Sequence, residues 1–502
     1  MRMPATRKRA VAAVLAGGLP VLSFPAPALW WFAYVALVPW LLLLRTAPTG
    51  RRAAFEGWLG GAGFLLAVHS WLVPNLHVFI VLLAALLGLL WAPWGWLVRA
   101  VLGGTPSMAL AAAAVAVVPS GWLMIELVRS WQGLGGPWGL MGASQWQVPP
   151  ALRLASVGGV WLVSLLVVAV NTAIAVVIAV PRARLAGVAA VVLCALVTGA
   201  VSAWAPRPQT TGHARIAVVQ PGVIPGPDRR LAREEELTRA LAGQRLDLVV
   251  WGESSVGEDL YALPGLTADL AALSHDVGAD LLVNVDARRT GAAGSGGGIY
   301  KSSVLMGPQG LTGQRYDKMR LVPFGEYVPL RPVLGWVTSV GRAARENRLR
   351  GTHQVVMDLP GGGPRVGPLI CFETAFPDMS RNLVGDGAQV LVAQSSTSTF
   401  QDSWAPAQHA SLGALRAAET GRSMVHATLT GISAVYAPDG APVGRRLPVH
   451  GSTAEVYDVP VARGTTPFVR YGDWAVYGAL GALCGLGAVV GVRRFSGPGR
   501  GR

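Results

Sequence analysis

The stretch VGPLICFETAFPD, Val366–Asp378, decides the fold class of this chain. It opens with a short apolar run of the kind that forms a buried strand, and Pro377 then begins a predicted helix. Side chains at the carboxyl end of a strand in an α/β sheet face the crevice in which ligands bind. The pattern therefore predicts an α/β domain with Cys371 at a strand-to-helix turn, where the helix N-terminus favours a thiolate. A small buried hydrophobic residue is the alternative interpretation of this cysteine.

Similar apolar runs surround this stretch. Strand-like segments separated by turn residues recur from Ala214 to Val459, and three segments between them have helical periodicity. Because strands alternate with helices, the region predicts a layered α/β or α+β domain of about 250 residues, which we place at residues 207–470. The predicted helices are Leu231–Leu241, Leu266–Val277 and Pro406–Glu419.

The remainder of the chain has the composition of a membrane protein. Of its 502 residues, 52% are hydrophobic and only 14% are charged, whereas soluble proteins carry about 25% charged residues. Eight apolar runs approach the length that crosses a bilayer, so we predict seven transmembrane helices in residues 1–206 and an eighth, with a cytoplasmic tail, in residues 471–502. A cleaved signal peptide is the alternative for the first run, which follows a basic N-terminus. The runs are Val11–Leu22, Leu29–Leu44, Trp58–Val73, Val78–Val98, Met108–Leu127, Val157–Val180, Leu185–Trp204 and Trp474–Val492.

Basic residues are distributed unevenly around these runs. If every run crosses the bilayer, the clusters at Arg7–Arg9, Arg51 and Arg182 fall on one side, whereas the opposite loops at Ser23–Ala28 and Pro74–Asn75 carry no Lys or Arg. The positive-inside rule makes the basic side cytoplasmic, which places residues 207–470 outside the cytoplasm. Much of the net charge of +15 therefore reflects topology, and a nucleic-acid partner is not expected.

One external loop, Ser130–Pro150, has an unusual composition. It contains three Trp and five Gly, which makes it too broken to cross a membrane and too aromatic for an ordinary linker. We expect it to lie at the membrane interface beside the active site. A re-entrant loop with a purely structural role is the alternative.

Two further stretches carry polar residues in similar contexts. LDLVVWGE places Glu253 just beyond a buried strand, and YDKMRLVPFGEYVP places Lys318 in a loop rich in Pro and Gly. With Cys371 they supply a possible base, electrophilic stabiliser and nucleophile. Taken singly, the carboxylate fits a surface ion pair and the lysine a solvated loop. No metal-ligand spacing is present and three cysteines make no disulfide framework, so neither a metal nor a cofactor is expected.

The three stretches together resemble the carbon–nitrogen hydrolase (nitrilase) superfamily, whose signature is a Glu–Lys–Cys triad on an αββα sandwich. YDKMRLVPFGEYVP is the most specific motif, and WGES and LICFE support it. The resemblance implies that Glu253, Lys318 and Cys371 form the triad. It also implies that Glu326 and Glu373 occupy further acidic positions of the site, which bind substrate or support the triad.

With its predicted spans, the chain is similar over nearly its whole length to the membrane-bound branch of that superfamily, the apolipoprotein N-acyltransferases. This resemblance implies a phospholipid acyl donor, a thioester on Cys371, and a lipoprotein acceptor whose N-terminal diacylglyceryl-cysteine presents its α-amine. It also implies a multi-pass protein of the bacterial inner membrane with an extracytoplasmic catalytic domain. A membrane-tethered amidase or nitrilase-type hydrolase with the same triad is the alternative. A receptor without turnover is disfavoured because all three triad residues are present.

The sequence departs from the family pattern in two places. Phe372 stands where the family usually has Tyr, so the backbone N–H that would help to stabilise an oxyanion remains but the ring hydroxyl is lost. Ser395–Gln401, SSTSTFQ, replaces a family stretch that resembles SNDAWFG, and we expect it to line the acyl or lipoprotein pocket. Gln408–His409 and the run Arg416–Arg422 keep the family pattern.

Overall fold

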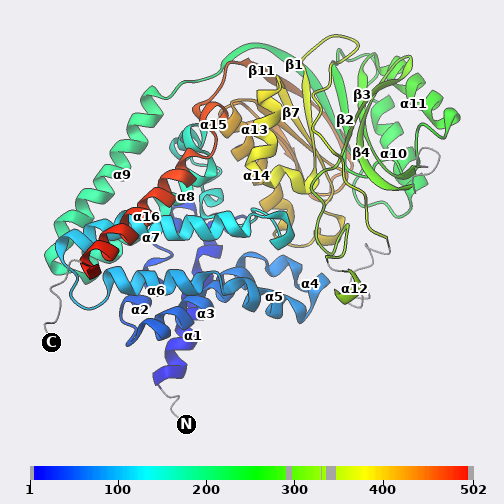
Figure 1. The fold of residues 1–502 in the computed structure, drawn as a ribbon. Coiled ribbons are helices and arrows are strands. Elements are labelled where there is room, and N and C mark those ends of the chain that lie inside the picture. The colour runs from blue at the N-terminus through cyan, green and yellow to red at the C-terminus, as the bar shows by residue number, and fades with distance from the viewer. Residues whose placement is uncertain (1–4, 290–296, 330, 335–345, 496–502) are drawn as a thin grey trace, which may run out of the picture.

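Figure 1 shows the computed structural model of the chain, which describes residues 5–289, 297–329, 331–334 and 346–495. Helices from the first 204 residues lie on one side together with α16 (Trp474–Phe495), and a domain of two β-sheets lies on the other. The chain enters the sheet domain after α9 (Arg184–Trp204) and leaves it before α16. The helical part is therefore made of segments from both ends of the sequence.

Within the described residues, three segments are long and apolar enough to cross a membrane, namely α7 (Met108–Arg129), α8 (Pro149–Ala179) and Pro181–Trp204. The number rises to at most five if two bent pairs of helices each count as one span. One pair, α3 (Gly50–Val68) with Ser70–Leu76, bends by 65°. The other pair, α5 (Phe79–Gly88) with α6 (Trp91–Leu102), bends by 42°.

The other predicted runs form shorter elements. The run Leu29–Leu44 corresponds to an apolar helical segment at Trp30–Arg45, and the last run corresponds to Trp474–Val489. The first run overlaps α1 (Ala5–Gly18). Length and composition thus identify up to five spans within the described part of the chain, whereas the hydropathy of the sequence predicts eight.

Small residues and aromatic rings pack the helical part. A Cβ on Gly17 of α1 would lie 1.9 Å from the carbonyl oxygen of Gly60 in α3, so glycine allows the two backbones to touch, as is usual between membrane helices. Deeper in the bundle, the buried Trp122 ring meets those of Trp40 and Trp91 edge-on, with centroids 6.1 and 5.6 Å away. These contacts hold together the helices that carry the three rings.

The sheet domain consists of six-stranded and five-stranded sheets. The first has the order β11-β1-β2-β3-β4-β5 and the second β10-β9-β8-β7-β6. The parallel strands β1–β2–β3 lie at the centre of the first sheet, and the parallel strands β6–β7–β8 occupy one side of the second, with β6 at its edge. Antiparallel strands complete both sheets. The strands are β1 (Gln209–Gln220), β2 (Leu248–Trp251), β3 (Asp280–Arg289), β4 (Gly298–Gly307), β5 (Gly310–Asp317), β6 (Val366–Ile370), β7 (Val390–Ser395), β8 (Ser423–Thr428), β9 (Ser433–Tyr436), β10 (Pro442–Leu447) and β11 (Thr453–Arg463).

The two sheets pack face to face between two layers of helices. Gln394 of β7 joins the sheets, since its Nε2 donates to the carbonyl oxygens of Trp251 and Leu282 at 2.9 and 3.0 Å. A buried apolar cluster that includes Leu237 and Leu270 holds the outer helices against the first sheet. The domain is thus the αββα sandwich that the sequence predicts, and the three predicted helices are confirmed. The outer helices are α10 (Pro227–Arg239) and α11 (Pro264–Val277) on the first sheet, and α13 (Pro377–Gly385) and α14 (Ala405–Thr420) on the second.

The sandwich is attached to the helical part at a break in α8. Gly158 and Gly159 have non-helical backbone angles there, and Gly159 has a φ of +68°. The freed N–H of Val160 donates to the Glu419 carboxylate of α14 at 2.7 Å. A side chain of the sandwich thereby supplies the hydrogen-bond acceptor for a backbone N–H that the break in the apolar helix leaves without one. This hydrogen bond fixes the position of one domain against the other.

Candidate active site

Cys371 is the first residue after β6 and has a left-handed backbone conformation, with a φ of +51°. This conformation is uncommon for a residue with a side chain and is often found at functional sites. A 3₁₀ turn, Cys371–Ala375, follows, and α13 begins only at Pro377. The sharp turn directs the Cys371 side chain away from the sheet and into the space between the two domains, as its place in the cavity wall described below shows.

Glu253 and Lys318 follow the ends of β2 and β5, and the fold brings them together. The Lys318 Nζ donates to Glu253 Oε1 at 2.9 Å and to Glu326 Oε1 at 2.8 Å. All three side chains are buried. The other oxygen of Glu326 accepts the backbone N–H of Val322 at 2.8 Å, which fixes the loop after Lys318. Three of the predicted site residues therefore form one hydrogen-bonded cluster.

Lys301 completes this cluster, and the sequence prediction missed it. Its Nζ lies 2.9 Å from Glu253 Oε1, 3.3 Å from Glu326 Oε1 and 3.8 Å from the Asp286 carboxylate. β4 begins at Gly298, so Lys301 lies inside this strand. A lysine inside a buried strand needs an anionic partner, and this is the signal that could have identified it.

The two lysines decide the charge of Glu253. Burial alone would raise the pKa of this carboxyl, but Lys301 and then Lys318 outweigh burial and lower the pKa to about 2. Burial likewise opposes the charge on each ammonium, and Glu253 and Glu326 outweigh it, so the pKa of both lysines is raised. The site at rest therefore holds an ionised Glu253 carboxylate beside two protonated lysines.

The thiol of Cys371 is neutral at rest, so the sequence-based expectation of a favoured thiolate is wrong. Desolvation by burial and then the Glu253 carboxylate raise the pKa of Cys371 to about 12, and the opposing effect of Lys318 is smaller. The helix N-terminus does not rescue the thiolate because α13 starts beyond the intervening 3₁₀ turn. Removal of the thiol proton must therefore accompany the attack on a substrate.

Glu373 supports the site through hydrogen bonds that its carboxylate accepts. Its Oε1 accepts the Tyr316 hydroxyl at 2.7 Å and the backbone N–H groups of Met319 and Arg320 at 2.7 and 3.0 Å. Its Oε2 accepts the N–H of Ile370 at 2.8 Å. This one buried carboxylate joins the strand that carries Cys371 to the loop that carries Lys318. Of the two roles that the sequence left open for Glu373, this geometry fits support.

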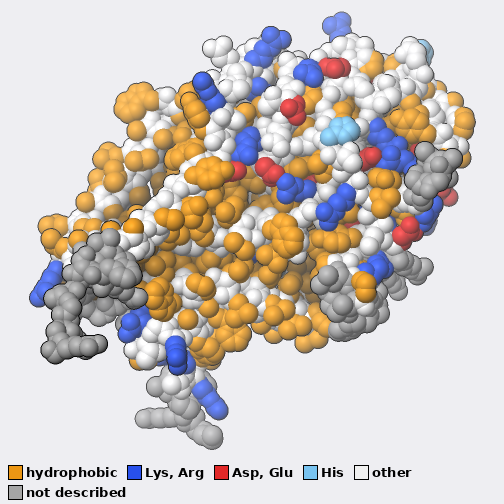
Figure 2. Space-filling model, viewed as in Figure 1, with side chains coloured by type: hydrophobic (Ala, Val, Ile, Leu, Met, Phe, Trp, Pro, Cys, Tyr) orange, Lys and Arg blue, Asp and Glu red, His pale blue; other side chains and the backbone are white. Residues whose placement is uncertain are grey.

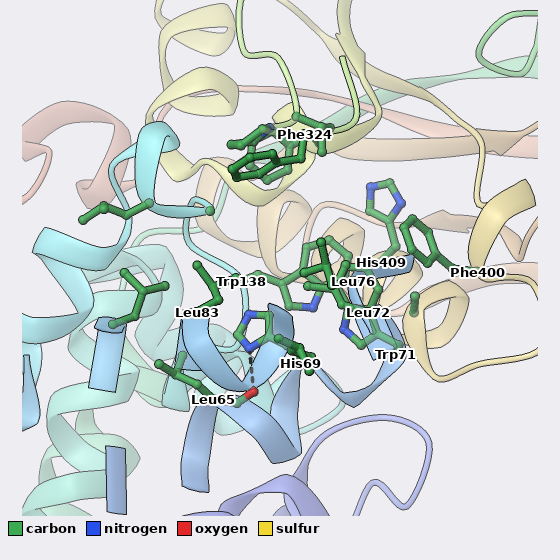
Figure 3. Close-up of a pocket in the computed structure, with 18 of the residues that line it drawn as sticks. Leu65, His69, Trp71, Leu72, Leu76, Leu83, Trp138, Phe324, Phe400 and His409 are labelled. Atoms are coloured by element: carbon green, nitrogen blue, oxygen red, sulfur yellow. Dashed lines mark hydrogen bonds between the residues drawn. The ribbon is translucent and has the colours of Figure 1, made fainter. Parts of the chain in front are cut away.

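A largely apolar cavity of about 250 Å³ lies between the two domains, and Cys371 is part of its wall. Figure 3 shows Leu65, His69, Trp71 and Leu83 facing it from the helical part and His409 from the sandwich. The cavity is thus built jointly by helices of the membrane type and by the domain that carries Cys371. Such a space is suited to hold an acyl chain beside the thiol.

The two departures from the family pattern both border this cavity. Ser396, Thr397 and Phe400 of the altered stretch line it. The Phe372 ring also lines it and packs edge-on against Phe376, with the centroids 5.0 Å apart. The replacements therefore change the wall of the cavity and leave the charged cluster intact.

The Ser130–Pro150 loop closes the cavity on the helical side. The Trp138 indole donates to Gln408 Oε1 at 2.7 Å, and its ring centroid lies 5.6 Å from that of His409. His409 in turn contacts the carbonyl oxygen of Cys371 through Nε2 at 3.0 Å. The loop therefore lies beside the active site, as predicted. His409 is a residue of the site that sequence reasoning noted only as part of a motif.

Comparison with known proteins identifies the family of the chain. The family model for the apolipoprotein N-acyltransferase N-terminal domain matches residues 16–173, and the carbon-nitrogen hydrolase model matches residues 215–452. Apolipoprotein N-acyltransferases from Pseudomonas aeruginosa and Azotobacter vinelandii are each 30% identical to the chain, cover 94% of it and are matched over 94% and 93% of their own lengths. An amidase of known structure from Nesterenkonia sp. aligns with 50% of the chain and 92% of its own length at 20% identity, with a TM-score of 0.34. The chain belongs to the apolipoprotein N-acyltransferase family.

Proposed function

We propose that this chain transfers an acyl chain from a phospholipid to the N-terminal α-amine of the diacylglyceryl-cysteine of bacterial lipoproteins. Membership of its family makes it an acyltransferase that acts on lipoproteins. The observation that carries the proposal is that Cys371 lines an apolar cavity built by both domains. A thiol in that place can meet an acyl chain that stays in apolar surroundings, whereas exposure to water costs about 0.8 kcal/mol per CH₂.

The first half-reaction puts the acyl group on the enzyme. Glu253 takes the thiol proton as the Cys371 sulfur attacks the ester carbonyl of the phospholipid. The Lys318 ammonium and the backbone N–H of Phe372 stabilise the oxyanion that forms, and one such donor is worth about 3 kcal/mol of barrier. As the intermediate collapses, the C–O bond breaks and the glyceryl oxygen takes the proton from Glu253. A lysophospholipid leaves, and a thioester remains on Cys371.

The second half-reaction passes the acyl group to the lipoprotein. The α-amine attacks the thioester carbonyl, and Glu253 accepts a proton from the attacking nitrogen. The C–S bond then breaks, and the proton returns from Glu253 to the departing Cys371 sulfur. The amide product leaves with an unchanged enzyme, so the cycle is of the ping-pong type.

The same proposal places the chain in the inner membrane with eight crossings. Seven lie in residues 1–206 and one in residues 471–502, and the catalytic domain, residues 207–470, faces the extracytoplasmic side. Figure 2 supports this placement, since a broad band of hydrophobic side chains separates the arginine and lysine side chains near the two termini from the charged catalytic domain. The rule that loops rich in Arg and Lys stay in the cytoplasm gives the orientation.

The alternative hydrolase would pass the acyl group to water, and product analysis separates the two. The purified protein is incubated in mixed micelles with phospholipid and a synthetic diacylglyceryl lipopeptide, and the products are resolved by mass spectrometry. N-acylated lipopeptide formed in step with lysophospholipid is the expected result. Free fatty acid in place of acylated peptide would make the chain a hydrolase.

A further inference from the structure

Lysine is rare in this chain, and its distribution is informative. Lys8, Lys301 and Lys318 are its three lysines, so every other residue in its Lys plus Arg total of 42 is arginine. Both lysines of the sandwich domain bind the same atom, Glu253 Oε1, at 2.9 Å each. Both lysines that lie outside the N-terminal segment therefore contact the same carboxylate oxygen of the site.

The surroundings of Lys301 fit an ammonium better than a guanidinium. Its Nζ has carboxylate oxygens of Glu253, Glu326 and Asp286 at 2.9, 3.3 and 3.8 Å. An ammonium is a compact charge with three donors that point in different directions, whereas the donors of arginine lie in one plane. The position therefore demands the chemistry of lysine and not positive charge alone.

We propose that Lys301 is a positioning residue for acyl transfer, which holds the Glu253 carboxylate in place while Lys318 also serves the oxyanion. The inference rests on the proposed function, in which Lys318 stabilises the oxyanion with its third N–H donor while its other two bind Glu253 and Glu326. Lys301 keeps its ion pairs with Glu326 and Asp286 at that moment. Lys301 can therefore stay in place when Glu253 is protonated. Its positive charge then favours the return of the Glu253 carboxyl to the ionised state.

The assignment makes a prediction about pH. A base must be ionised to act, so activity falls as the pH drops through the pKa of Glu253. With both lysines present that pKa is about 2, and the rate of acyl-enzyme formation should not decline on the acidic side between about pH 8 and about pH 5. Removing one cation raises the pKa of Glu253 and moves the decline into this range.

The test measures single-turnover release of lysophospholipid against pH for K301M, K301Q and K301R. K301M and K301Q should lose roughly tenfold or more between pH 8 and pH 5, whereas K301R keeps the charge and should retain the flat profile at a lower rate. R445M is the control for loss of an arginine charge, because Arg445 is exposed and pairs with Glu455 on the surface. It should behave as the unmodified protein.

Each outcome decides between a positioning and a purely structural role. Flat profiles in both neutral variants, or the same acidic decline in K301R, would overturn the proposal. Glutamine keeps a hydrogen-bonding side chain, so K301Q carries the comparison if K301M does not fold. The unmodified protein tests the proposed function in the same experiment. No release of lysophospholipid there means that the proposed function is wrong, whereas release with flat variant profiles means that only the role of Lys301 is wrong.

Discussion

Cys371 combines a turned backbone with a neutral thiol, and both features follow from its surroundings. A φ of +51° directs the side chain out of the sheet, and burial with the nearby Glu253 raises the pKa of the thiol to about 12. The sequence predicted the residue and its position at a strand end, because the pattern of a strand followed by Pro is local. It could not predict the protonation state, which depends on groups brought in by β2, β4 and β5.

The neutral thiol leads to a prediction about E253Q. The Glu253 carboxylate is one cause of the raised pKa of Cys371, so its removal lowers that pKa and increases the thiolate fraction at neutral pH. Alkylation by a small neutral reagent should then be faster than in the parent protein, by about tenfold for each unit that the pKa falls, although acyl transfer is lost.

The alkylation rates of E253Q and the parent protein are measured from pH 6 to pH 9, a span of about three units around neutrality. In both proteins Cys194 and Cys484 are replaced by alanine, so that Cys371 is the remaining thiol. Slower labelling of E253Q would contradict this account. It would mean that Glu253 draws the proton from the thiol even in the free enzyme.

Among the elements, those with a local signal were predictable and those that depend on pairing were not. Helices α10, α11 and α14 show their periodicity in the sequence. Lys301, by contrast, reaches Glu253 only because β3 and β4 pair with Lys301 opposite Asp286. Register is set by the assembled sheet. The bends after α3 and between α5 and α6 also escaped prediction, because hydropathy records apolar character and not direction.

The Ser130–Pro150 loop allows a test at this scale. Gly135 and Gly136 both have positive φ, at +100° and +71°. A Cβ on Gly136 would lie 2.7 Å from the Phe372 ring and 2.8 Å from the Phe376 ring, whereas a Cβ on Gly135 meets nothing within 4 Å. G136A should therefore push the loop away from the turn that carries Cys371, and G135A should impose backbone strain alone.

We expect G136A to lower the rate of acyl transfer roughly tenfold to a hundredfold below G135A, since small displacements near the reacting atoms are costly. Transfer rates and thermal unfolding of the two variants are compared in the same detergent. Equal loss of activity in both would show that the contact between the loop and Phe372 has no role in catalysis.

In the molecule as a whole, the cavity beside Cys371 belongs to neither domain alone. The hydropathy of the sequence separates a membrane part from an α/β part, and the residues of the charged cluster are found in the second. The cavity itself could not be predicted, because it depends on how Glu419 and Gln408 hold the sandwich against α8 and the Ser130–Pro150 loop. It is this attachment that places the thiol next to apolar helices.

The proposed orientation predicts where reporter proteins become active. A reporter fused after Pro206 or after Asp439 should behave as extracytoplasmic, and one fused after Arg502 should behave as cytoplasmic, because the basic residues flank one set of helix ends. Paired alkaline phosphatase and green fluorescent protein fusions give opposite signals on the two sides. A cytoplasmic signal at Asp439 would exclude transfer at the outer face of the membrane.

The central claim is that Cys371 carries the acyl group, and intact-mass spectrometry tests it most directly. The protein is incubated with phospholipid in the absence of a lipopeptide, and its mass is recorded before and after hydroxylamine treatment. We predict one added acyl group that hydroxylamine removes, both in the parent protein and when Cys194 and Cys484 are replaced together by alanine. C371A should show no added mass. An acyl adduct on C371A, or none on a well-folded parent protein that still acylates lipopeptide, would contradict the thioester mechanism.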